Sequence, residues 1–371
     1  MLIRSSRFPA RSVVRDWFFW LAGAYLGLFV AAALLAGWLP LESGSVQSEL
    51  AHLRKPPFGS AALVERRPGE PLHWLGTDQL GRDVGIILVH GCRTALLVSL
   101  PAMSLAVGIG LALGGMAGYF GDRTVRISRA AWLALPLVVL GGYFYGFYLR
   151  RELLRAAFEQ NAWSGLQASL TSGLVASLAL IPGFWLTKGL QRMAWFRHRT
   201  WLPVDQAVLR TIELLSSVPN LVLVLLLASL TGPSLGLLVL VTGLTYWTEP
   251  ARLVRAEILR IRALPYVESA RAMGAPEAYI LLRHALPNAL PPVLVAFTFG
   301  VGRLMALEST LSFLGFGVPP GTPSWGRMIN GMRTNPEAWW LAVFPGAVLC
   351  ATVLALHVCS DRLLRRLGRR H

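Results

Sequence analysis

Long apolar stretches alternate with short charged ones along this chain of 371 residues. A helix needs about 20 consecutive, mainly apolar residues to cross a bilayer. Eight stretches come near that length, and we expect each to form a transmembrane helix: 17–39, 94–119, 130–149, 168–187, 214–230, 234–247, 289–307 and 338–358. The pattern predicts an all-α polytopic membrane protein with about eight transmembrane helices. Proline and glycine inside several stretches are compatible with this, because neighbouring helices can satisfy the backbone groups that they free.

The distribution of Lys and Arg predicts how the spans are oriented in the membrane. Cytoplasmic segments of membrane proteins carry an excess of Lys and Arg. With the N-terminus in the cytoplasm, the inside segments carry 23 Lys and Arg residues, and the outside segments carry 11. The inside segments are 1–16, 120–129, 188–213, 248–288 and 359–371, and the outside segments are 40–93, 150–167 and 308–337. We therefore expect both termini in the cytoplasm.

The net charge of +16 raises the question of a nucleic-acid partner. Such a partner needs Lys and Arg gathered on one soluble domain. Here the basic residues lie in short clusters between apolar stretches, so we expect membrane lipid and no nucleic acid. The basic start leads into about 23 apolar residues, which is too long for a cleaved signal peptide. The first stretch should remain as an anchor.

The loop at 248–288 has the most distinctive pattern. A helix over 251–263 should end at Pro265, and a second short helix should begin near Tyr266. Tyr266, Val267, Ala270, Met273 and Gly274 share one face at helical spacing. Gly274 can stop this helix in the left-handed conformation, and Pro276 suits the start of a next helix that ends at Pro287. The pattern fits either a rigid element that contacts a soluble partner or an amphipathic loop on the lipid surface.

The same loop carries a family resemblance. Glu268-Ser269-Ala270, then Gly274, then Leu286-Pro287 resemble the EAA loop of bacterial ABC-importer permeases, with Ser269 where alanine is usual. Further segments follow in the order of the dipeptide/oligopeptide/nickel branch: GTDQLGRD (76–83), GYFG (118–121), Val204-Asp205 to Arg210, Glu308 with LSFLG (311–315), SWG (324–326), FPG (344–346) and Asp361. The chain resembles the C-type permease of that branch, the subunit that carries the GTDxLGRD segment.

The resemblance implies the six spans of a type I ABC-importer permease, the first at 17–39 and the other five in a permease core at 94–121 and 204–371, which includes the EAA loop 248–288. Ahead of it lie a cytoplasmic N-terminus (1–16), a first span (17–39) and an external segment with GTDQLGRD (40–93). Residues 122–203 are extra to the family pattern and form an inserted two-span hairpin. Another departure is Arg303, a charged residue within a span, five residues before Glu308.

The resemblance also implies the function. It is transport of peptides or similar small solutes across the bacterial inner (cytoplasmic) membrane, with the membrane-spanning path shared with a second permease subunit. The other implied partners are two cytoplasmic ABC ATPase subunits and an extracytoplasmic solute-binding protein. The implied ATPase-coupling residues are Tyr266, Val267, Glu268, Ser269, Ala270, Met273, Gly274, Leu286 and Pro287. No GxxxxGK[ST] loop is present in the sequence, so ATP hydrolysis is expected in a separate chain, and no cofactor is expected.

Two other functions compete with transport. An intramembrane enzyme is disfavoured because the seven histidines form no HExxH motif and no GxSxG segment occurs. Asp78 and Asp83 fit structural capping better than a catalytic carboxylate pair, and no metal site is expected. A permease-like scaffold or sensor, using the insert 122–203 to bind another protein, stays open. Which solute is carried and which side chains line its path also stay open.

Overall fold

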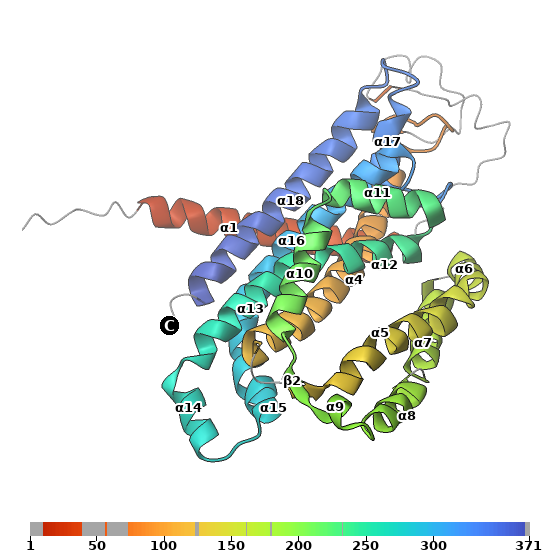
Figure 1. The fold of residues 1–371 in the computed structure, drawn as a ribbon. Coiled ribbons are helices and arrows are strands. Elements are labelled where there is room, and N and C mark those ends of the chain that lie inside the picture. The colour runs from red at the N-terminus through yellow and green to blue at the C-terminus, as the bar shows by residue number, and fades with distance from the viewer. Residues whose placement is uncertain are drawn as a thin grey trace, which may run out of the picture. The chain divides into compact units, whose positions relative to one another are not determined.

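The computed structural model describes residues 10–38, 56–57, 73–122, 126–160, 162–178, 180–231 and 233–367. The predicted all-α fold is confirmed, since helices dominate these residues (Figure 1). The strands named among them are β1 (Arg126–Ser128) and β2 (Arg199–Trp201), which pair antiparallel with Ile127 opposite Thr200. The chain divides into two compact units, Met1–Met103 with Leu294–His371, and Ser104–Val293. We call them the first and the second unit.

The first unit is built from long helices and one short one. They are α1 (Ala10–Leu35), the start of α4 (Val84–Phe120), the end of α16 (Leu286–Leu314), α17 (Trp325–Gly331) and α18 (Trp340–Leu367). Helix α1 packs on α18, where the Tyr25 hydroxyl donates to the Val348 carbonyl oxygen at 3.1 Å. Most of the predicted external segment 40–93 lies outside the described residues.

The second unit contains the remaining helices. In chain order they are the end of α4, α5 (Arg129–Tyr143), the π-helix η1 (Phe144–Tyr148), α6 (Arg151–Gln160), α7 (Ala162–Leu178), α8 (Leu180–Leu190), α9 (Ala194–Arg197), α10 (Val204–Ser216), α11 (Asn220–Thr231), α12 (Leu235–Tyr246), α13 (Thr248–Arg262), α14 (Pro265–Ala272), α15 (Glu277–Tyr279), the π-helix η2 (Ile280–Ala285) and the start of α16. The predicted insert forms α5 to α9, with α5 packed on α7 and α8.

Among the described residues six helical segments are long and apolar enough to cross a membrane, or seven if one bent pair counts as one span. The predicted count of about eight differs at two segments. The predicted span 214–230 is broken between α10 and α11, whose axes meet at 77°. Pro219 lies in this break, lacks an N–H and disfavours helical backbone in the residue before it. The predicted span 234–247 forms the 12-residue helix α12, about 18 Å long, which is short of a bilayer core.

Two predicted helix ends also differ from the structure. Helix α4 begins at Val84, ten residues before the predicted start at 94. The polar residue Thr94 is buried there and donates to the Pro323 carbonyl oxygen at 2.7 Å, so protein contacts compensate its polarity. Pro287 was predicted to end a helix, but η2 leads directly into α16. The Leu286 N–H bonds to the Leu281 carbonyl, five residues back, and this wider turn removes the usual conflict between proline and the preceding helical turn.

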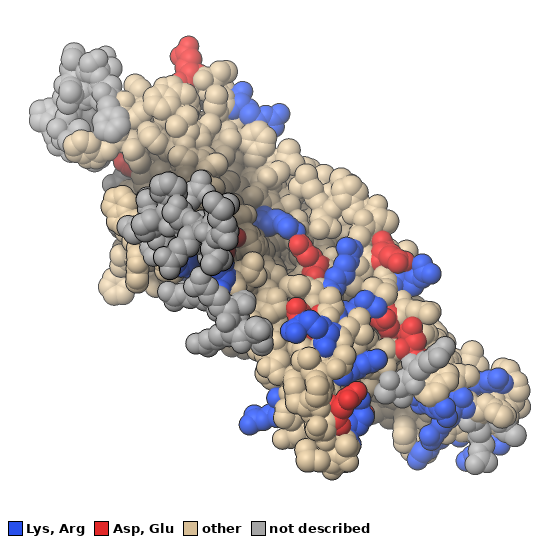
Figure 2. Space-filling model, turned by 90° about the vertical axis from the view of Figure 1, so that its left-hand side faces the viewer, with Lys and Arg blue, Asp and Glu red and all other residues tan. Residues whose placement is uncertain are grey.

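Apolar side chains cover much of the helical surface. Many large ones are exposed on α1, α5, α7, α8 and α18. In Figure 2 most Lys, Arg, Asp and Glu side chains lie in the middle and lower part of the view, and the upper part is mainly uncharged. A surface of this kind suits helices that face lipid or other helices.

Candidate functional site

The loop between α12 and α16 folds into a compact helical element in the second unit. Helix α14 starts with Pro265 at its first turn and ends at Ala272, followed by Gly274 with φ of 81°. The Gly274 N–H bonds to the Arg271 carbonyl and the Ala275 N–H to the Ala270 carbonyl at 3.2 Å. These two bonds form a Schellman motif, which needs the left-handed residue that glycine provides. The predicted stop at Gly274 is confirmed.

Helix α14 has a buried face and an exposed face. Val267 is fully buried and Ala270 nearly so, within an apolar cluster that includes Ile258, Ile280 and Ala285. On the other side, Tyr266 is 41% exposed and Met273 is 82% exposed. A side chain added at Gly274 would meet nothing within 4 Å. The single apolar face predicted from spacing is therefore divided, because Val267 and Ala270 are buried against the chain itself and Met273 is largely exposed.

Polar contacts fix the far end of this element. The Arg271 side chain donates from Nε to Glu277 Oε1 at 2.9 Å, and the Tyr119 hydroxyl donates to the same carboxylate. The hydrogen bond to Glu277 raises the pKa of the Arg271 guanidinium above its usual value. Arg262 Nη1 also donates to the Tyr119 carbonyl at 2.8 Å. Tyr119 of the GYFG segment thus joins α4 to α13 before α14 and to α15 after it.

Glycines on α4 bring α13 into close contact. Gly110, Gly114 and Gly118 recur every four residues, and a Cβ at Gly114 would lie 2.3 Å from the Ala251 carbonyl oxygen. At the other two glycines a Cβ would lie 2.7 Å from atoms of α13. Small residues at this spacing let membrane helices approach backbone to backbone. The helix that carries α14 is therefore held directly against a long helix of the second unit.

An ion pair adds to this packing. Arg255 on α13 donates from Nη2 to Asp205 Oδ2 on α10 at 2.6 Å, and this bond raises the pKa of the Arg255 guanidinium. Asp205 belongs to the Val204-Asp205 segment of the family resemblance. The segment and the loop, 50 residues apart along the chain, meet in the second unit.

The remaining predicted coupling residues lie around α14. Glu268 and Ser269 are exposed, and the Ser269 hydroxyl donates to the Pro265 carbonyl at 2.9 Å. Leu286 is half-buried and packs against the apolar cluster, whereas Pro287 is exposed. Sequence reasoning missed Tyr119 and Glu277 as partners of this element. The GYFG segment marked Tyr119 as notable, but nothing in the sequence pairs it with a residue 158 positions away.

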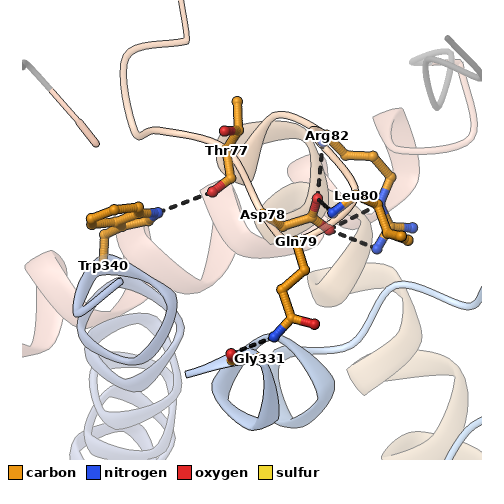
Figure 3. A network of polar contacts seen from close by, with 7 residues as sticks. All are labelled: Thr77, Asp78, Gln79, Leu80, Arg82, Gly331 and Trp340. Atoms are coloured by element: carbon orange, nitrogen blue, oxygen red, sulfur yellow. Dashed lines mark hydrogen bonds and ion pairs between the residues drawn. The ribbon is translucent and has the colours of Figure 1, made fainter. Parts of the chain in front are cut away.

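The GTDQLGRD segment forms a closed turn at the start of α4 in the first unit (Figure 3). Asp78 Oδ1 accepts from the N–H groups of Leu80 and Arg82 at 2.8 and 2.9 Å, and Asp78 Oδ2 accepts from the Arg82 side chain at 2.7 Å. Asp83 caps α4 by accepting from the Gly85 N–H at 2.6 Å. The capping expected for Asp78 and Asp83 is confirmed.

Side chains from elsewhere in the first unit secure this turn. Trp340 Nε1 donates to the Thr77 carbonyl at 3.1 Å, and the Gln79 amide donates to the Gly331 carbonyl (Figure 3). Gln79 Nε2 also donates to Thr334 Oγ1 at 2.6 Å. The turn is therefore tied both to α18 and to the end of α17.

A second buried polar group lies in the same unit. Glu308 on α16 is 2% exposed and accepts from Ser312 Oγ at 2.7 Å and Ser324 Oγ at 2.8 Å. Trp325, which follows Ser324, is fully buried and donates from Nε1 to the Leu88 carbonyl at 3.1 Å. Gly326 follows with no room for a side chain, since a Cβ there would lie 1.8 Å from the Ser309 carbonyl oxygen. The SWG segment is thus a wedge held between α4 and α16.

These features are those of an α-helical, multi-span membrane protein with a compact helical element ahead of the long helix α16. The family described as "Binding-protein-dependent transport system inner membrane component" matches residues 192–371. The chain is 35% identical over 212 residues to a Brucella suis biovar 1 (strain 1330) protein that is assigned, by name only, as a peptide transport system permease. That match covers 56% of this chain and 69% of the relative.

A second relative extends over more of the chain. The dipeptide transport system permease protein DppC of Bacillus subtilis (strain 168) is 26% identical over 345 residues, which cover 92% of this chain and 79% of the relative. The chain belongs to the binding-protein-dependent transport system inner membrane component family. The prediction of an ABC-importer permease is confirmed, and the chain is a multi-pass inner-membrane transport component, not itself the catalytic part.

Proposed function

We propose that this chain is one of two permease subunits of a peptide importer and that α14 docks into a cytoplasmic ATPase subunit. The names of the relatives, which specify peptides and dipeptides, support the substrate class. In the proposed complex two ATPase subunits hydrolyse ATP, and an extracytoplasmic solute-binding protein delivers the solute. This permease and a second one form the path between them.

One observation carries the docking proposal. Helix α14 is held rigidly on its inner side by Val267 and Ala270, while Met273 projects with 82% exposure and Gly274 leaves open space beside it. A large apolar side chain on a fixed short helix is suited to fill a pocket of a partner. The open space at Gly274 would let the partner approach the backbone. Tyr266 belongs to the same exposed surface, and its hydroxyl accepts from Asn288 Nδ2 at 3.1 Å.

The proposed topology places α14 and both termini in the cytoplasm. The distribution of Lys and Arg supports it, with 23 in the inside segments against 11 outside. In this arrangement the GTDQLGRD turn is extracytoplasmic. We treat residues 122–203 as an insertion into the permease core, because they lie between the GYFG segment and Val204-Asp205, which adjoin each other in the family pattern.

Purification of the full chain from its native membrane in mild detergent tests the proposal, together with radiolabelled dipeptide uptake by the same cells. We expect a second permease and an ATPase with a GxxxxGK[ST] motif in the purified complex. Met273→Asp should remove the ATPase and abolish uptake, because a charge replaces the apolar side chain at the proposed contact. Met193→Asp is the matched control, since Met193 is 60% exposed and lies in the insert.

Gly274→Asp should act like Met273→Asp. Its control is Gly321→Asp, because Gly321 has φ of 86° and equally open surroundings, so the backbone strain is alike. Retained ATPase and normal uptake in both loop variants would contradict docking through α14. Purification with unrelated proteins and no ATPase would favour a membrane scaffold instead.

A further inference from the structure

The insert carries a concentration of positive charge at one end. Arg126, Arg129, Lys188, Arg192 and Arg199 all lie near the β1–β2 pairing or at the adjoining helix ends. The sequence contains no Asp or Glu at 123–151 or at 160–204. The flanking acids are engaged elsewhere, since Asp205 pairs with Arg255 and Asp122 accepts from the Gln206 N–H at 3.0 Å. We call this end of the insert the basic end.

Aromatic rings accompany these cations. The Arg126 guanidinium lies 3.9 Å from the Trp201 ring centre, and that of Arg129 lies 4.8 Å from the Trp195 ring centre. Lys188 Nζ lies 4.6 Å from the Phe184 ring centre. A ring covers the flat face of a guanidinium and leaves its N–H edge directed outward, where it can bind phosphate oxygens. Tryptophan beside Lys and Arg is also typical of the level of lipid headgroups.

The basic end is fixed rather than loose. The Arg129 N–H bonds to the His198 carbonyl at 3.0 Å, and Gln191 Nε2 donates to Ser128 Oγ at 2.9 Å. Ser128 in turn caps α5 by accepting from the Ala131 N–H. These bonds bring the end of α8 to the start of α5, so that Lys188 and Arg129 belong to the same end of the hairpin.

An apolar cavity of about 550 Å³ lies further along the same helices. It is lined by residues of α5, η1, α7 and α8: Leu137, Val138, Gly141, Tyr145, Val175, Leu178, Pro182, Gly183 and Leu186. Leu137 is eight residues after Arg129 on α5, which corresponds to about 12 Å along the helix. On α8, Leu186 is only two residues before Lys188. Arg129 and Lys188 therefore lie beside one end of the apolar cavity, as the phosphate of a phospholipid lies beside one end of its acyl chains.

We propose that the insert 122–203 binds an anionic phospholipid, with its phosphate at Arg129 and Lys188 and an acyl chain in the apolar cavity. A free anion would use the cations alone and leave the cavity without a role. A soluble protein with an acidic patch would match the basic end, but the cavity lies between helices that are long and apolar enough to cross the membrane, where a soluble surface does not reach. The phospholipid is the occupant that matches both.

Native mass spectrometry of the full chain in mild detergent tests this, with phosphatidylglycerol and phosphatidylethanolamine added in equal amounts. We expect retained phosphatidylglycerol in excess over phosphatidylethanolamine. In Arg129→Gln/Lys188→Gln the preference should fall by about fivefold for each charge removed. The matched control is Arg150→Gln/Arg155→Gln, which removes two positive charges at the other end of the hairpin and should keep the preference.

Two further variants separate the proposal from misfolding and from simple anion binding. Arg129→Lys/Lys188→Arg keeps both charges and should keep the preference. Gly141→Leu fills the cavity and should lower retention of both lipids, while excess inorganic phosphate should displace neither. An unchanged preference in Arg129→Gln/Lys188→Gln would overturn the proposal. So would cross-linking of Leu137→Cys to a second permease or a second copy in the intact complex, because the cavity would then be covered by protein.

Discussion

Helix α14 and the SWG wedge both belong to segments that stand out in the sequence, but their surroundings differ. The wedge is enclosed, with Trp325 fully buried and the Glu308 carboxylate accepting hydrogen bonds from two serines. Helix α14 is enclosed on one side only, where Val267 and Ala270 are buried, and Met273 on the other side is largely exposed. Each segment carries a glycine. Gly326 in the wedge has no space for a side chain, whereas Gly274 after α14 has open space beside it.

This difference separates two uses of a sequence motif. Replacing a residue of the wedge should destabilise the chain itself, because every contact there is internal. Replacing an outward residue of α14 should leave the chain folded and change only what it binds. Helix α14 has both buried and exposed positions, so substitutions within this one helix can test the distinction.

Ala270→Asp should have the largest effect on stability. The new carboxylate would lie among Val267, Ile258 and Ala285 with no partner, at a cost of about 3–5 kcal/mol. Its unfolding temperature in detergent, followed by intrinsic tryptophan fluorescence, should fall well below that of the wild type. Ser269→Asp is the matched control on the adjacent exposed position and should unfold near the wild-type temperature. Equal temperatures for the two variants would contradict the division of α14 into two faces.

Gly326→Ala should have the next largest effect on stability. Its Cβ would overlap the Ser309 carbonyl oxygen, and forced overpacking of this kind costs about 3 kcal/mol at the upper end of the usual range. The same thermal assay measures the loss. Gly346→Ala in α18 has open space and should leave stability unchanged or slightly raised, because alanine favours helix. A tolerated Gly326→Ala would show that the wedge is not closely packed.

Glu308→Ala should destabilise the first unit by about 2 kcal/mol, because the hydroxyls of Ser312 and Ser324 lose their acceptor in a buried position. Glu308→Gln keeps an oxygen acceptor and should recover most of that loss. The comparison of the two unfolding temperatures is the measurement. If both variants match the wild type, the carboxylate does not hold the wedge.

Arg271→Ala should have the smallest effect, about 0.5 kcal/mol, since its ion pair with Glu277 is partly exposed. The effect should shrink further at high salt concentration, which screens exposed charges. Thermal unfolding at low and at high salt measures this. A large loss of stability that does not depend on salt would mean that Arg271 stabilises the chain mainly by packing and not by its ion pair with Glu277.

Sequence patterns were sufficient for the fold class and for the rigid loop. Long apolar stretches gave the helices, and the run from Pro265 to Gly274 gave both ends of α14, because proline and glycine restrict the backbone locally. The break at Pro219 and the continuation of helix through Pro287 were not predicted. A proline can break a helix or be accommodated by a π-turn, and the surrounding packing decides which.

Contacts between segments that are distant along the chain could not be predicted from the sequence either. The bond from Tyr119 to Glu277 joins residues 158 positions apart, and the pair of Arg255 with Asp205 joins residues 50 positions apart, so both depend on how the helices pack. Helical spacing placed Val267 and Met273 on one face, but it could not show that the neighbouring helices cover only Val267. Which side of α14 stays exposed follows from tertiary packing alone.

The most direct measurement is disulfide cross-linking at α14 in the assembled transporter. Single cysteines at Met273 and at Val267 would be introduced after replacing Cys92, Cys350 and Cys359 with serine, and paired with cysteines around the proposed pocket of the ATPase. Met273→Cys should cross-link to the ATPase and Val267→Cys should not, because Val267 is fully buried. An intact, transporting complex in which Met273→Cys forms no cross-link to the ATPase would contradict the proposal that α14 is the coupling element.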